Sequence, residues 1–195
     1  MTFSPSASPQ SLAAGRPSRP ALLACLALAL SLGTACSVNP PPRWQEGGAP
    51  LLIQPARWDR ADNDPIEILP NGQVLEDGDP IMLVDRVGRV VDEDNEPIAI
   101  LLPDGFVGGN DNQLLGRVGV SNAAPPNGAA AWVAILPDGN VVYYDSDGDQ
   151  EADGRWVGCD GPARRTCTLI THMILVRHYQ RQPRSGVSVG IGIGL

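Results

Sequence analysis

Three copies of one short turn motif constrain the fold more than any other feature of this chain. The copies are ILPNGQV, LLPDGFV and ILPDGNV, starting at Ile68, Leu101 and Ile135, so they follow one another at intervals of 33 and 34 residues. Proline presets φ at the first corner of a turn, asparagine or aspartate suits the next, and glycine accepts the positive φ that closes a hairpin. Each copy therefore predicts two antiparallel strands joined by a tight turn.

A second element, a glycine-arginine pair before β-branched or aromatic residues, recurs as VGRVV, LGRVGV and DGRWVG. Short apolar runs bounded by turn residues fill residues 51–195, without the 3.6-residue period of an amphipathic helix. The sequence predicts an all-β domain of about three 34-residue hairpin repeats, as a sandwich, small barrel or prism-like repeat. We expect residues 168–179 to form a long strand. We expect residues 186–195 to form a final strand, with a frayed tail as the alternative.

The N-terminus has the arrangement of an export signal. Residues 1–35 contain Arg16 and Arg19 but no acidic residue, and their apolar run ALLACLALALSL is shorter than a membrane span of about 20 residues. Small residues, GTA, precede Cys36. These features resemble a bacterial lipoprotein signal peptide, and the resemblance implies cleavage before Cys36 and lipid attachment to its side chain. A competing motif, LLAC, ends at Cys25, and a plain cleaved secretory signal is a further alternative.

The resemblance divides the chain into three parts. Residues 1–35 are the signal peptide, residues 36–50 the lipidated cysteine with a flexible tether rich in proline and glycine, and residues 51–195 the β-repeat domain. Such a protein is anchored in the cell envelope by its lipid without crossing the membrane. By the sorting rule known for this lipoprotein class, Ser37 favours the outer over the inner membrane. The domain resembles uncharacterised β-repeat domains found behind such signals, a resemblance that names no activity.

Two cysteines remain after signal removal and lipidation, Cys159 and Cys167. Export places them in an oxidising compartment, and the turn-rich DGPARRT between them is long enough for the chain to double back. We therefore expect a disulfide between them. A zinc site would need two further ligands, and the two histidines, His172 and His178, lie outside any finger-like spacing.

Charge is divided unevenly along the chain. The net charge is -8, all 22 acidic residues lie between Glu46 and Asp160, and all 14 basic side chains are arginine. The C-terminal arginines are Arg164, Arg165, Arg177, Arg181 and Arg184. They either pair with the acidic part of the chain as an adjacent strand or face an anionic surface of lipid headgroups or polysaccharide. Nucleic acid is not an expected partner of an exported acidic protein.

An acidic loop follows the third turn motif. Its aspartates stand at positions 1, 3, 5 and 9 of DSDGDQEADG: Asp145, Asp147, Asp149 and Asp153. This spacing resembles the calcium loops of EF-hands, dockerins and thrombospondin type 3 repeats. The resemblance implies that the aspartates bind Ca²⁺ by their side chains, with Asp153 acting directly or through water, and Glu151 by its backbone carbonyl. A solvated hairpin tip, in which aspartates bond their own backbone, is the alternative.

The motifs SxxK and HExxH do not occur in this sequence, and we assign no catalytic residue. On one strand His172 and His178 would share a face, which an envelope hydrolase acting on glycan or peptide would use. The sequence instead favours a lipid-anchored envelope protein with a structural or binding role and a calcium-stabilised loop. A surface adhesive or sensory module is a further alternative. The expected partners are the membrane, through the lipid, and an envelope protein or glycan.

Overall fold

The protein is described by a computed structural model that covers residues 38–145 and 147–181. Within these residues the chain forms twelve β-strands, two 3-10 turns and one α-helix. The strands are β1 (Ala56–Asp59), β2 (Ile66–Ile68), β3 (Gln73–Glu76), β4 (Asp79–Val84), β5 (Arg89–Asp92), β6 (Pro97–Leu101), β7 (Phe106–Gly109), β8 (Leu114–Val118), β9 (Asn122–Ala124), β10 (Val133–Ile135), β11 (Asn140–Tyr144) and β12 (Gln150–Val157). The 3-10 turns are η1 (Asn110–Asn112) and η2 (Gly161–Ala163), and the helix is α2 (Arg164–Arg181).

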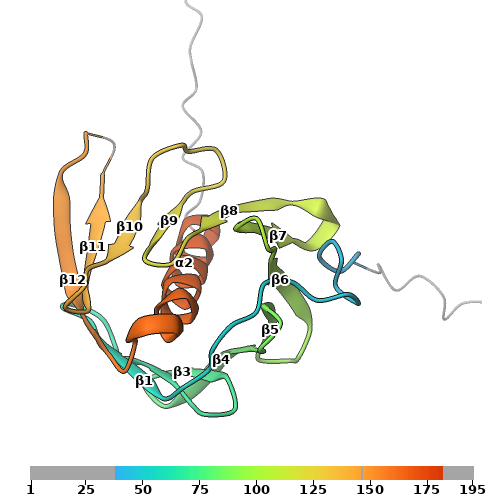
Figure 1. Cartoon of the computed structure of the whole chain (residues 1–195), viewed down its shortest axis with the longest axis horizontal. Coiled ribbons are helices and arrows are strands. Elements are labelled where there is room, and N and C mark those ends of the chain that lie inside the picture. The colour runs from blue at the N-terminus through green and yellow to red at the C-terminus, as the bar shows by residue number, and fades with distance from the viewer. Residues whose placement is uncertain (1–37, 146, 182–195) are drawn as a thin grey trace, which may run out of the picture. The chain divides into compact units, whose positions relative to one another are not determined.

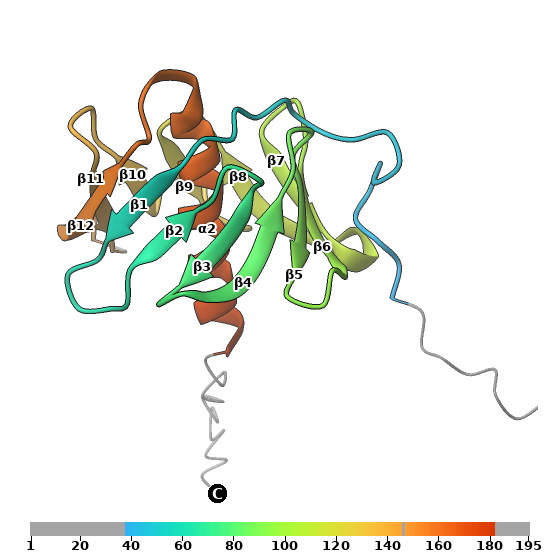
Figure 2. The same ribbon diagram turned by 90° about the horizontal axis from the view of Figure 1, so that it is seen from below.

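The strands form one closed antiparallel barrel. Each strand pairs with its neighbours in the sequence, and β12 pairs with β1 to close the ring, with Trp58 opposite Trp156. Figure 1 shows this wall of strands surrounding α2, and Figure 2 shows it from the side. The prediction of a β domain is confirmed. Of the predicted architectures, the chain adopts the barrel.

The long strand predicted for residues 168–179 is wrong, because these residues belong to α2. The helix lies inside the barrel, and its side chains are buried without interruption from Thr166 to Ile174. A helix enclosed on all sides needs no polar face, so its sequence lacks the apolar period that identifies a surface helix. Its many β-branched residues, which are common in strands, also favoured the incorrect prediction of a strand.

The three predicted hairpin turns have the same backbone geometry. In the first, Leu69 N–H donates to Gln73 O at 2.8 Å and Gly72 N–H donates to Leu69 O at 2.9 Å, and the other two turns repeat both bonds. The glycine φ angles are +89°, +89° and +92° at Gly72, Gly105 and Gly139. The motif therefore encodes the turns that join β2 to β3, β6 to β7 and β10 to β11.

The core lies between the inner face of the wall and α2. Buried residues alternate with exposed ones along β1, and the rings of Trp58 and Trp156 stack at 5.7 Å. Buried polar groups on the helix find partners: Trp156 Nε1 donates to Thr171 Oγ1 at 3.0 Å, and Thr168 Oγ1 donates to Val120 O at 2.9 Å. Such pairing offsets the cost of placing threonine in an apolar interior.

The predicted disulfide between Cys159 and Cys167 is confirmed. Their Cα atoms lie 6.1 Å apart, and the bond joins the segment after β12 to the first turns of α2. It therefore holds the chain where it passes from the barrel wall to the interior.

Residues 38–50 lie against the barrel, although the sequence predicts a flexible tether there. Gly48 N–H donates to Val87 O and Ala49 N–H donates to Leu101 O, both at 2.7 Å. These bonds give partners to backbone carbonyls that the strand ladders leave free. The folded unit consequently starts at residue 38, before the predicted boundary.

Candidate functional site

The two histidines lie on α2 in different environments, so the prediction that they share a face is wrong. Successive helical residues turn by about 100°, which separates positions six apart. His172 is fully buried and His178 is exposed. The structure therefore removes the pair on which the hydrolase alternative depends.

His172 is a neutral structural group in the barrel core. Trp132 Nε1 donates to its Nδ1 at 3.1 Å, so its Nε2 carries the proton and donates to Leu115 O at 3.0 Å. Burial lowers the pKa of His172 to about 4, although the bond to Leu115 O acts in the opposite direction. With both ring nitrogens occupied by core partners, His172 has no free atom for proton transfer to a substrate.

The acidic loop has the geometry of a hairpin tip around Asp145. Asp145 Oδ1 accepts hydrogen bonds from the N–H groups of Asp147 and Asp149, both at 2.9 Å. Asp153 lies apart in β12, 8% exposed, where its Oδ2 accepts from Tyr143 Oη at 2.9 Å and its Oδ1 from Ala61 N–H at 3.1 Å. The Asp153 carboxylate is thus hydrogen-bonded to the β1–β2 loop and to Tyr143. Glu151 lies in β12 opposite Tyr143.

Metal ligation finds little support in the described part of the chain. No group of three or more histidine, cysteine, aspartate or glutamate residues there is placed to hold a metal ion. Calcium binding at the loop stays a prediction. If it occurs, the structure limits the side-chain ligands to Asp145, Asp147 and Asp149.

A buried polar cluster closes the β1–β2 loop onto the wall. Arg60 has a side chain 3% exposed, and it donates to Glu76 Oε1 and to Asp64 O, both at 2.5 Å. The pKa of Tyr143 is raised well above its usual range, first by burial and then by the charge of Asp153. Tyr143 therefore stays a hydrogen-bond donor at all physiological pH values, which suits a structural contact.

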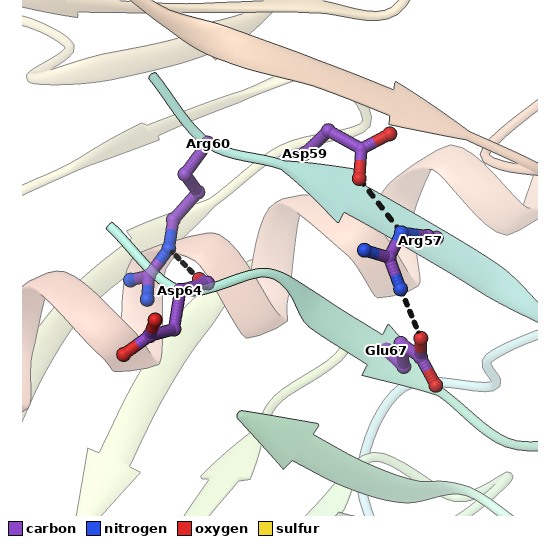
Figure 3. Close-up of polar contacts among 5 residues, drawn as sticks. All are labelled: Arg57, Asp59, Arg60, Asp64 and Glu67. Carbon is purple, nitrogen blue, oxygen red and sulfur yellow. Dashed lines mark hydrogen bonds and ion pairs between the residues drawn. The ribbon is translucent and has the colours of Figure 1, made fainter. Parts of the chain in front are cut away.

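On the outer face of the same strands Arg57 pairs with Asp59 at 2.7 Å and with Glu67 across to β2 (Figure 3). All three side chains are at least 38% exposed. Solvent screens exposed pairs of this kind, so they stabilise the fold only weakly.

Carboxylates gather at the end of the barrel where α2 terminates, here called the acidic end. Five loops and the adjoining strand ends supply them: Asp62, Asp64, Glu76, Asp77, Asp79, Asp92, Glu93, Asp94, Glu96, Asp111, Asp145, Asp147, Asp149 and Glu151. Of the C-terminal arginines, Arg164, Arg165 and Arg177 do not pair with them along a strand, because these three lie on α2. Arg177 does reach Glu93, at 3.8 Å.

An open pocket of about 450 Å³ lies along the outside of β8 and β9 and reaches the opposite end of the barrel, here called the helix-start end. Its walls come from the β6–β7 turn, the β8–β9 segment, the β9–β10 loop and the first turn of α2. Arg117 and Arg165 contribute the positive charge and Asp104 the negative charge. Sequence reasoning missed this pocket, although both the Gly116–Arg117 pair and the Arg164–Arg165 pair were visible in the sequence.

Comparisons with protein-family models, with curated proteins and with solved structures find no match for this chain. In the part that the structure describes, no helix combines the length and the apolar character needed to cross a bilayer. Cys36 and residues 186–195 lie outside the described residues. The pocket at the helix-start end is therefore the candidate site that the geometry itself supplies.

Proposed function

We propose that this chain is a lipid-anchored protein of the bacterial cell envelope, with its lipid on Cys36, and that its barrel has a binding or structural role without catalysis. The filled interior supports the second part: α2 occupies the space in which a barrel of this kind would hold a ligand. A partner would then bind on the outer surface of the barrel or at its two ends. An envelope protein or glycan is the proposed partner class, and the outer membrane is the proposed location.

The short link between lipid and barrel refines this proposal. Only Ser37 separates Cys36 from Val38, so at most about 7 Å of extended chain joins the lipidated residue to the folded unit. Asn39 is held to the barrel by two bonds to Asp111 Oδ1, at 3.0 and 3.2 Å. We infer that the chain between the lipid and the barrel is short.

Labelling tests the anchor. Cells that express the full chain and are fed radioactive palmitate are expected to label the wild type and the Cys25→Ala variant, and to leave Cys36→Ala unlabelled. The Cys25 variant is the matched control because the competing motif ends there. Label on Cys36→Ala would remove the lipid anchor at Cys36 from the proposal.

Calcium stabilisation of the acidic loop is a second part of the proposal. A loop with three aspartates at alternate positions is expected to bind Ca²⁺ with a dissociation constant of about 0.1 to 1 mM, as extracellular modules do. Titration calorimetry of the full chain should show this uptake, and Asp147→Asn with Asp149→Asn should abolish it. Asp153→Asn should leave uptake intact, because that side chain is bound elsewhere. Heat signals that are equal in wild type and double variant would contradict calcium binding.

We also propose that the barrel consists of three four-strand units, each containing one copy of the turn motif. Their hairpins are four strands apart, and each turn glycine carbonyl accepts from a residue two strands on: Val84, Val118 or Trp156. Exchanging ILPNGQV and ILPDGNV between their hairpins is therefore expected to change the melting temperature by less than about 4 °C. A larger loss would show that each turn is specific to its position.

A further inference from the structure

We propose that the pocket at the helix-start end binds a small organic carboxylate, held by Arg117 and Arg165. Its lining combines these two guanidinium groups with apolar side chains, which are the two recognition elements of such a ligand. This assignment concerns the barrel surface alone and does not depend on lipid attachment at Cys36.

The two guanidinium groups flank the β6–β7 turn. Arg117, on the outer face of β8, lies over the ring of Phe106 at 4.7 Å. Arg165, from the first turn of α2, places its Nη2 about 4.0 Å from the position that a Cβ on Gly105 would take. Strand β8 and helix α2 are distant in the sequence, so only the folded barrel brings the two charges to one turn.

Both groups have free hydrogen-bonding capacity. Among the described residues neither arginine forms an ion pair, and the enclosed Nε of Arg165 has no hydrogen-bond partner. Neighbouring Arg164 also has an Nε without a partner, but its Nη2 donates to Pro137 O at 3.0 Å. Guanidinium groups present paired N–H donors that match the two oxygens of a carboxylate.

The charge in the pocket favours a ligand with one negative charge. Arg117 and Arg165 together carry +2, and the Asp104 carboxylate in the same lining carries -1, which leaves +1. Asp104 Oδ1 already accepts from Phe106 N–H at 3.1 Å, so this carboxylate is fixed near the turn. A monoanionic carboxylate would neutralise this net charge, whereas a phosphate dianion would leave a net charge of -1 in the pocket.

The apolar part of the lining fits a short hydrocarbon chain. Ala124 of β9, which is paired with Arg117, and Ala129 and Ala131 of the β9–β10 loop lie beside the arginines. Their small side chains leave room for methylene groups of a ligand, and burial of each methylene strengthens binding. A carboxylate with a few methylene groups should therefore bind more tightly than acetate.

Titration of the full chain in detergent micelles tests the proposal, with the arginine Nε–Hε resonances as the readout. Butyrate is expected to shift the resonances of Arg117 and Arg165 saturably, with about fivefold tighter binding than acetate at constant ionic strength. Arg117→Gln and Arg165→Gln are each expected to weaken butyrate binding about tenfold. Arg86→Gln, an exposed arginine at the same end that does not line the pocket, should bind as the wild type does.

Three results would overturn the proposal. They are an absence of saturable shifts with butyrate, equal weakening by Arg86→Gln and Arg117→Gln, and tighter binding of inorganic phosphate than of butyrate. Each variant is first checked for a wild-type melting temperature. If Arg165→Gln does not fold, the exposed Arg117→Gln variant decides the outcome alone.

Discussion

Replacing Gly116 by alanine is expected to lower the free energy of unfolding by about 4 kcal/mol. Gly116 has a φ of +134°, which side-chain-bearing residues rarely adopt. A Cβ there would lie 2.4 Å from the backbone oxygen of Ala124 on β9, and 2.6 Å from Cε1 and 2.9 Å from Nε2 of His172. His172 cannot move away easily, since Trp132 and Leu115 hold both of its ring nitrogens. The glycine therefore sets how closely β8 approaches the central helix.

Gly78→Ala is the matched control for this prediction. Gly78 also has a positive φ, +86°, but a Cβ there would meet nothing within 4 Å. This variant should lose only about 1 kcal/mol, from backbone strain. Urea unfolding followed by tryptophan fluorescence measures both values. Equal losses in the two variants would show that the close contacts with Ala124 O and His172 have no energetic consequence.

Acidification is expected to destabilise the barrel through His172 by about 3 kcal/mol. The unfolded chain binds a proton on this histidine near its usual pKa of 6.5, but burial lowers the pKa in the folded chain to about 4. The unfolded state thus binds more protons between these two values, so stability falls as pH drops from about 6.5 to about 4. Protonation would also place an N–H group on Nδ1, facing the N–H of Trp132.

Unfolding free energies of wild type and His172→Gln, measured between pH 7 and pH 4, test this prediction. The variant is expected to be less stable at pH 7 and to lose about 3 kcal/mol less on acidification, because it has no group to protonate there. His178→Gln, at an exposed position on the same helix, should follow the wild-type curve. Parallel curves for wild type and His172→Gln would assign the acid sensitivity to carboxylates elsewhere.

The turn motif shows what short-range physics can predict. A proline, an aspartate or asparagine and a glycine in sequence restrict the backbone locally, so the turns at Gly72, Gly105 and Gly139 were predictable without knowledge of the rest of the chain. The Cys159–Cys167 pair was predictable for a similar reason, because a short loop brings its ends together in most conformations.

Helix α2 shows where local reasoning fails. Periodicity reports a boundary between core and solvent, and the segment from Thr166 to Ile174 meets no such boundary because the barrel surrounds it. The pocket could not be predicted from the sequence for a different reason. Arg117 and Arg165 come from β8 and α2, and only closure of twelve strands around the helix places them at one turn.

The sequence by itself thus determined the hairpins, the disulfide and the expectation of a lipid anchor, all of which depend on residues close together in the chain. The tertiary structure alone decided that the sheet closes on itself, that its interior holds a helix, and that His172 is a core residue. It also decided which charges come together, separating Asp153 from the acidic loop and placing Arg117 and Arg165 in the lining of one pocket. The physical reason is that such contacts depend on the packing of distant segments, which no short stretch of sequence encodes.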